Sequence, residues 1–192
     1  LISSCRCWYS FLYFGHNPSL VSVLNGGLKK WKQEGKPVVN TITKIYKTNY
    51  SAIENKDMVK SKNEIDKNIS LKKFKVIDAR SRERFQGKVS EPRPNVRSGS
   101  IEDSSCLPFD ELINKKNNTF KDSKDLNLSF KKIINTQDNN VVFSCGSGVT
   151  ASVLALAYSL INNKYKPAIY DGSWSEYGLI KWKDQLKFYQ LL

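Results

Sequence analysis

The chain has 192 residues, 40% of them apolar and 11% aromatic, which is the balance of a folded globular protein. No uncharged apolar run reaches the length of about 18 residues that a membrane-spanning helix requires, so we expect no membrane partner. The 31 Lys and Arg against 18 Asp and Glu give a net charge of +13, but the lysines are scattered in ones and twos. The lack of a basic block argues against nucleic-acid binding, and a positive surface favours small anionic substrates.

The four cysteines, at positions 5, 7, 106 and 145, show none of the Cys and His spacings of a zinc site, and His16 is the only histidine. Cys5 and Cys7 are too close in sequence to pair easily with each other. We therefore expect free thiols in a reducing compartment. The expected location is cytoplasmic, with the mitochondrion as the alternative for a eukaryotic source.

The first part of the chain predicts short elements. We expect a helix over residues 4–15, a buried strand over 21–24, a turn at 25–27 and a short helix that begins at Leu28 and stops by Gly35. Residue 1 is Leu, and the apolar start lacks the charge order of a signal peptide, so we expect the chain to begin inside a folded element. Polar residues from 39 to 56 predict a linker.

The second part alternates strand and helix patterns. We expect an exposed helix over 58–68, a strand over 74–78, a long loop over 80–99, a strand-like stretch at Cys106, a weak helix over 129–135, a strand over 141–144, an apolar helix over 151–162 and a strand over 168–170. This alternation predicts an α/β fold with a mostly parallel central sheet flanked by helices.

An internal echo suggests a duplicated domain. Residues 21–31 and 167–177 share the order of a short strand, an Asx-Gly-small turn and an aromatic-bearing helix, and an apolar helix precedes each. At roughly 150 residues per domain, the length predicts one complete domain and part of another. We therefore expect a C-terminal remnant of one domain over 1–38, a linker over 39–56 and a complete domain over 57–192.

The strongest local unit is the loop that begins at Cys145. It follows a buried strand, contains Gly146 and Gly148, and leads into a helix. Glycines allow consecutive N–H groups to turn inward, and a helix N-terminus behind them favours negative charge, so the thiol is expected to be a reactive thiolate. The hydroxyls of Ser147 and Thr150 could bind a substrate or cap the helix. The alternative is a buried structural cysteine beside a glycine turn.

Two families have a cysteine loop of this kind. A tyrosine-type phosphatase needs an Arg six positions after the Cys, and this chain has Ala151 there. The run Cys145-Gly146-Ser147-Gly148-Val149-Thr150-Ala151 instead resembles the active-site loop of the mercaptopyruvate-using, two-domain members of the rhodanese family. Further segments are similar to that family: 76–80 to the first strand of its catalytic domain, 84–94 to its substrate-binding loop, 170–174 to its last strand and turn, and 4–31 to the end of its noncatalytic domain.

The resemblance implies sulfur transfer from 3-mercaptopyruvate, a small anionic sulfur donor, through a persulfide on Cys145. Pyruvate is released, and a thiol such as thioredoxin, or cyanide, removes the outer sulfur, with no metal or organic cofactor. The implied catalytic residues are Cys145 and Ser147. The implied substrate-binding residues are Arg84, Arg93, Gly146, Gly148, Val149 and Thr150. Two arginines suit this role because a guanidinium matches a carboxylate bidentately, whereas Lys does not.

Two alternatives stay open. Family members that use thiosulfate resemble Cys-Arg-Lys-Gly-Val-Thr in this loop, so the neutral Gly146 and Ser147 make thiosulfate the second choice of donor. A noncatalytic rhodanese module that binds a partner protein is the other, because the family's first domain contributes a His and an Asp from a segment that this chain lacks. His16 matches a structural position. We expect Trp8, Trp31, Trp174 and Trp182 to serve in packing, Arg80 to tie the loop at Asp78, and Arg82 and Arg97 to lie on the surface.

Overall fold

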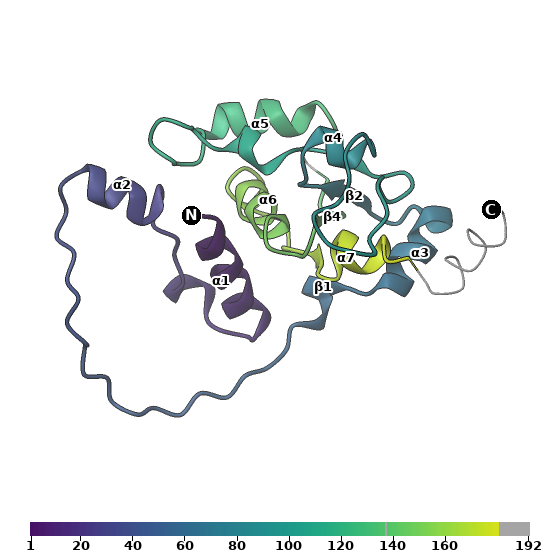
Figure 1. Cartoon of the computed structure of the whole chain (residues 1–192). Helices are drawn as coiled ribbons and strands as arrows, with labels where there is room; N and C mark the ends of the chain where they lie inside the picture. The colour runs from purple at the N-terminus through teal and green to yellow at the C-terminus, as the bar shows by residue number, and fades with distance from the viewer. Residues whose placement is uncertain (137, 181–192) are drawn as a thin grey trace.

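A single parallel sheet organises the computed structural model, which describes residues 1–136 and 138–180 (Figure 1). The strand order is β1-β5-β4-β2-β3, and every neighbouring pair is parallel. The predicted α/β class is confirmed. The strands are β1 (Val59–Lys60), β2 (Lys75–Asp78), β3 (Ser105–Cys106), β4 (Val141–Ser144) and β5 (Ile169–Tyr170).

Helices connect the strands and cover the sheet. In the described part of the chain, no helix is both long and apolar enough to cross a membrane. Three short 3-10 turns, η1 (Pro18–Leu20), η2 (Lys56–Met58) and η3 (Phe109–Leu112), join the larger elements. The α-helices are α1 (Ile2–Tyr13), α2 (Gly27–Gln33), α3 (Lys62–Leu71), α4 (Arg82–Phe85), α5 (Ser123–Lys131), α6 (Ala151–Ser159) and α7 (Ser173–Tyr177).

The two faces of the sheet carry separate cores because side chains alternate along each strand. Ile77 and Phe143 pack with α1, α5 and α6 on one face. Val76 and Val142 pack with α3 and α7 on the other. β4 is buried at all four positions, as expected for the central strand of a parallel sheet covered on both sides. The loop that follows β4 is therefore anchored to the most rigid part of the fold.

Several predicted elements form within a few residues of their expected positions. α1, α2, β2, β4, α6 and β5 were all expected, and the strand-like stretch at Cys106 is β3. The expected helix over 58–68 is instead β1 followed by α3, which begins at a capping box between Ser61 and Glu64. α5 begins six residues before the expected helix over 129–135 and overlaps it to Lys131, and the expected loop over 80–99 contains α4.

The predicted strand over 21–24 is wrong. These residues have no regular structure, and Leu24 is 54% exposed. A strand needs a hydrogen-bonded neighbour, and none of the five strands formed by the described residues pairs with this segment. The helix expected at the end of the first repeat copy (residues 21–31) does form, because residues 27–33 are helical. The duplicated domain and the boundaries at 38 and 56 remain predictions.

The N-terminal helix shares the core of the sheet. Cys5 and Tyr9 of α1 are buried against α6 (Figure 1). The Tyr9 hydroxyl donates to the Met58 carbonyl, which precedes β1, and lies 3.4 Å from the Pro167 carbonyl, which precedes β5. The expected linker forms a long extended arc, and its end returns to α1, where the Ile53 N–H donates to the Phe14 carbonyl at 3.1 Å. α1 is thus attached through Tyr9 to the residues before β1 and β5, and through Phe14 to the end of the arc.

Replacing the Tyr9 hydroxyl tests this attachment. Tyr9→Phe leaves the buried Met58 carbonyl without its donor, and an unpaired buried acceptor costs about 1–3 kcal/mol. We expect a loss of that size in the free energy of unfolding, measured by urea titration. Tyr46→Phe, at a side chain 94% exposed, serves as the matched control and should change nothing. Equal stability of the two variants would contradict this account.

Candidate active site

Cys145 is the first residue after β4, at the carboxyl edge of the sheet, where open α/β folds bind their ligands. Its side chain is almost fully buried, at 1% exposure, while Gly146 and Ser147 beside it are half-buried. The Ser147 N–H points at the Cys145 sulfur, at 3.4 Å between nitrogen and Sγ. The thiol is therefore buried next to residues that are themselves partly exposed, and one backbone N–H is directed at its sulfur.

The loop is held in place by a residue that the sequence did not single out. The Ser173 Oγ accepts the N–H of Cys145 at 3.1 Å and the N–H of Gly148 at 3.0 Å. The same hydroxyl lies 3.9 Å from the Cys145 Sγ and donates to the Tyr170 carbonyl at 2.8 Å. Ser173 is fully buried and adopts a positive φ of 50°. In the sequence, residues 170–174 stand out only for their similarity to the family's last strand and turn. The hydrogen bonds of the Ser173 hydroxyl become visible only in the folded structure.

The prediction that the two glycines turn consecutive N–H groups of the loop inward is only partly correct. Gly148 has the positive φ, 78°, but Gly146 does not, and Ser173 takes two of the loop's donors. The N–H groups of Gly146, Val149 and Thr150 donate to nothing among residues 1–136 and 138–180. Thr150 is the N-cap residue of α6, but its side chain makes no capping bond, because its backbone is helical rather than extended. Of the two roles expected for this hydroxyl, capping of α6 is therefore not observed, and substrate binding stays a prediction.

Both predicted arginines lie at the loop. A Cβ built on Gly146 would be 3.1 Å from an Arg84 Nη and 3.5 Å from an Arg93 Nη. Arg84 comes from α4 and Arg93 from the loop after it, so two segments distant from Cys145 in sequence converge on one backbone position. A side chain at position 146 would fill the space over which the guanidinium groups lie. The structure therefore brings the thiol and both arginines together.

A buried carboxylate orients Arg84. Glu91, with a side chain only 2% exposed, accepts hydrogen bonds from Arg84 and pairs with Arg80 at 2.7 Å. Arg80 itself is clamped by Asp78, at 2.7 Å, and by the Gly99 carbonyl, so the expectation that it ties this loop is confirmed. Burial alone would raise the pKa of Glu91, but the Arg84 hydrogen bond and both guanidinium charges outweigh it and lower the pKa. No pattern in the sequence pointed to Glu91 as the partner of Arg84.

Other predicted roles are now placed. Trp174 is fully buried, and Trp8 and Trp31 are half-buried, in keeping with packing, while Trp182 lies outside the described residues. Arg82 pairs with Glu111 on the surface, as expected. Arg97 was expected to be a simple surface charge, but its guanidinium stacks on the Trp174 ring at 4.5 Å. The flat guanidinium is attracted to the face of the indole, which the sequence could not show.

Cys106 and His16 take no part in the loop. Cys106 is half-buried at the end of β3, and burial raises the pKa of its thiol to about 11. His16 lies between the rings of Phe11 and Tyr50, at 5.3 and 5.7 Å, which is the structural role expected of it. Among the described residues, no group of three or more His, Cys, Asp or Glu side chains could hold a metal ion.

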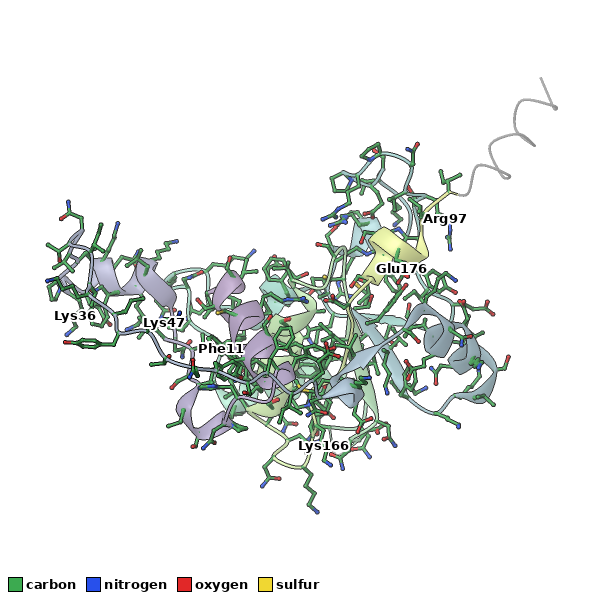
Figure 2. All side chains as sticks on the ribbon, turned by 90° about the horizontal axis from the view of Figure 1, so that it is seen from below. Phe11, Lys36, Lys47, Arg97, Lys166 and Glu176 are labelled. Atoms are coloured by element: carbon green, nitrogen blue, oxygen red, sulfur yellow. The ribbon has the colours of Figure 1, made fainter. Side chains whose placement is uncertain are left out.

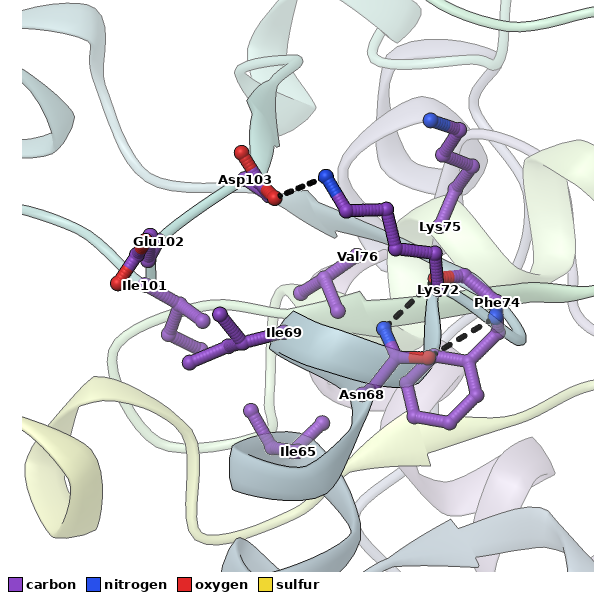
Figure 3. Close-up of a pocket in the computed structure, with 10 residues that line it drawn as sticks. All are labelled: Ile65, Asn68, Ile69, Lys72, Phe74, Lys75, Val76, Ile101, Glu102 and Asp103. Atoms are coloured by element: carbon purple, nitrogen blue, oxygen red, sulfur yellow. Dashed lines mark hydrogen bonds and ion pairs between the residues drawn. The ribbon is translucent and has the colours of Figure 1, made fainter.

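A pocket of about 130 Å³ lies at the opposite end of the sheet from Cys145 (Figure 3). Ile65, Val76 and Ile101 are among its apolar lining residues, and an ion pair of 2.8 Å joins Lys72 to Asp103 beside it. The Asn68 amide exchanges two hydrogen bonds with the Phe74 backbone at its edge. Lys75 and Glu102 also line the pocket, which lies at the amino end of β2 and away from the Cys145 loop.

Lysines lie at several places on the molecule rather than around the loop. Lys36 and Lys47 lie on the far side from α7, which carries Glu176, and Lys166 lies apart from both (Figure 2). The positive charge that the geometry brings to the thiol comes from arginines instead. The site therefore matches a small anion rather than an extended polyanion.

Comparisons with known proteins agree with this geometry. The family profile of the rhodanese-like domain matches residues 61–179. A thiosulfate/3-mercaptopyruvate sulfurtransferase of Arabidopsis thaliana is 33% identical over 92% of this chain and 57% of its own length. A 3-mercaptopyruvate sulfurtransferase of Mus musculus is also 33% identical, over 92% of this chain and 58% of its own.

Among solved structures, SseA from Escherichia coli, a 3-mercaptopyruvate sulfotransferase, superposes with a TM-score of 0.74 at 28% identity. The match covers 91% of this chain and 63% of SseA. The chain thus spans little more than half the length of the sequence relatives described above. What this chain shares with these proteins is the rhodanese-like domain over residues 61–179 and its fold.

The charge of Glu91 predicts a specific acid sensitivity. Because the folded state lowers the pKa of Glu91 below its ordinary 4.5, its stabilisation is present above that value and is lost as the pH falls through the folded pKa. Glu91→Gln breaks a buried pair and should cost about 3 kcal/mol at neutral pH. The stability difference from wild type, measured by urea titration, should shrink as the pH falls below 4.5. A difference independent of pH would contradict this.

Proposed function

The chain belongs to the rhodanese family, and we propose that it transfers sulfur from 3-mercaptopyruvate to an acceptor through a persulfide on Cys145. The observation that carries the proposal is the convergence of Arg84 and Arg93 on Gly146, next to a thiol whose Sγ faces the Ser147 N–H. A nucleophilic sulfur and two carboxylate-binding groups at one loop are what a small mercapto-acid substrate requires.

The arginines suit the substrate's carboxylate and keto oxygen. A guanidinium offers parallel N–H donors that match two oxygens, and Glu91 holds Arg84 in a fixed orientation. Arg93 is exposed and Arg84 half-buried, so an incoming anion meets one guanidinium at the surface and the other at depth. Bound in this way, the substrate's sulfur would be directed at Cys145, which saves the entropy of random encounter.

The first half-reaction then follows from the thiolate. Cys145 sulfur attacks the substrate sulfur, an S–S bond forms, and the substrate's C–S bond breaks with its electron pair moving to the methylene carbon. The resulting enolate takes up a proton and leaves as pyruvate. We assign the relay of this proton to the hydroxyl of Ser147, whose backbone N–H faces the Cys145 sulfur. The open N–H groups of Gly146, Val149 and Thr150, with α6 behind them, would stabilise the persulfide anion.

The second half-reaction returns the enzyme to its starting state. A thiolate, such as that of thioredoxin, or cyanide attacks the outer sulfur, and Cys145 leaves as the thiolate. The two half-reactions share one site, so ping-pong kinetics are expected. Each half-reaction proceeds by attack of one sulfur or carbon nucleophile on sulfur, so neither step as written calls for a metal or an organic cofactor.

Thiosulfate is the second candidate donor because the Arabidopsis relative carries both substrates in its name. The neutral Gly146 and Ser147 favour 3-mercaptopyruvate, since an inorganic dianion gains most from cations beside the sulfur. A noncatalytic binding module is the remaining alternative. The thiol and the two arginines at the loop argue against this alternative, because binding a partner protein requires neither a nucleophile nor a carboxylate-binding group there.

A sulfur-transfer assay tests the proposal directly. Brief exposure of the protein to 3-mercaptopyruvate should add one sulfur atom, seen by intact mass, and the gain should map to the Cys145 peptide. Cys145→Ser should show no gain, whereas Cys7→Ser, at an exposed cysteine of α1, should behave as wild type. An unmodified wild type with both 3-mercaptopyruvate and thiosulfate would overturn the proposal and favour a binding module.

The donor preference can be shifted at one position. Ser147→Lys places a cation beside the sulfur, and a contact worth about 1.4 kcal/mol changes the ratio of rates tenfold. We expect the ratio of kcat/KM for thiosulfate over 3-mercaptopyruvate to rise about tenfold. Ser147→Ala is the control and should not raise it. A wild type that already prefers thiosulfate would show that the neutral loop does not select the donor.

A further inference from the structure

Arg6 of α1 reaches the Cys145 loop from outside the residues matched by the rhodanese profile. Its guanidinium forms an ion pair with Asp171, directly after β5, and its Nη1 lies 3.5 Å from the Gly148 carbonyl. The contact is close, because a Cβ built on Gly148 would lie 2.8 Å from that Nη1. The two partners are 34% and 43% exposed, so water can reach the pair.

The two groups that Arg6 contacts belong to the loop and the turn that Ser173 joins. Gly148 ends the short loop that begins at Cys145, and its N–H donates to the Ser173 hydroxyl. Asp171 begins the turn that carries Ser173, whose hydroxyl also accepts the N–H of Cys145. A single guanidinium therefore joins the loop after β4 to the turn after β5.

We propose that Arg6 is a positioning residue for sulfur transfer, which holds the loop and the turn together and adds a positive charge that favours the anionic sulfur of Cys145. The inference rests on the proposed function and extends the active site to α1. In support, the pKa of Arg6 is raised, first by its hydrogen bond to Asp171 and to a smaller extent by the charge of Cys145.

Several other charged or titratable groups surround the loop and must be counted with Arg6. Two guanidinium groups lie over Gly146, one carboxylate lies with Arg6 at Gly148, and one carboxylate of α7 lies against Gly172; they are Arg84, Arg93, Asp171 and Glu176. Tyr9 of α1 interacts electrostatically with Arg6. Asp171 is the anion in direct contact with Arg6, so the pair contributes two opposite charges that can be removed one at a time.

This pairing separates an electrostatic role from a structural one. Arg6→Ala removes the cation and leaves the Asp171 carboxylate facing the loop, which should make the anionic sulfur less favourable. Asp171→Asn keeps the shape of the side chain and leaves the Arg6 cation unneutralised, which should have the opposite effect. A role in loop packing alone would move both variants in the same direction.

The experiment follows alkylation of Cys145 by iodoacetamide across pH, with the modified peptide identified by mass. We expect the pH midpoint to rise by about half a unit to one unit in Arg6→Ala, to stay near the wild-type value in Arg6→Lys, and to fall in Asp171→Asn. With 3-mercaptopyruvate, kcat should drop about tenfold in Arg6→Ala with less change in KM, and Arg6→Lys should recover part of it. Circular dichroism checks that each variant folds.

Arg82→Ala is the matched control, because Arg82 pairs with Glu111 on the exposed surface. It should leave the midpoint and kcat unchanged. Midpoints that move in the same direction in Arg6→Ala and Asp171→Asn, or that do not move, would overturn the inference. Alkylation needs no sulfur donor, so a wild type that forms no persulfide would refute the proposed function while the midpoints still decide the role of Arg6.

Discussion

The active loop depends on one buried hydroxyl. Ser173 Oγ accepts the N–H groups of Cys145 and Gly148 and donates to the Tyr170 carbonyl, so a single atom fixes the loop after β4 to the end of β5. These strands are neighbours in the parallel sheet, and their carboxyl ends open at the same edge. Without this bond, two buried N–H donors would have no partner, a cost of about 1–3 kcal/mol each.

Arginines lie next to the loop, and carboxylates pair with two of them. Arg84 and Arg93 lie over Gly146, and the buried Glu91 behind Arg84 keeps one guanidinium oriented. On the other side, Arg6 approaches Gly148 with Asp171 as its counter-ion. Each guanidinium that is held by a carboxylate loses freedom and part of its field, while Arg93 remains exposed to meet an anion. This arrangement suits a small carboxylate substrate better than a polyanion.

Much of the fold was predictable because its signals are local. Buried strands at 75–78 and 141–144 and the apolar helix after the cysteine loop follow from runs of apolar residues with glycine at their ends. The strand expected over 21–24 failed because pairing is not local, and the segment has no neighbouring strand among the described residues. β1 was missed for the converse reason, since two residues carry no period but find β5 beside them.

The sequence by itself determined the family, through the seven-residue loop from Cys145 to Ala151, and it named the two arginines whose chemistry a carboxylate needs. Only the tertiary structure decided that Arg84 and Arg93 meet at Gly146, that Ser173 holds the thiol loop, and that Glu91 and Arg6 belong to its surroundings. The physical reason is distance along the chain. The reactive groups of a loop are residues adjacent in sequence. The groups that orient those residues and set the electric field at the thiol are distant in sequence, and only the folded sheet brings them together.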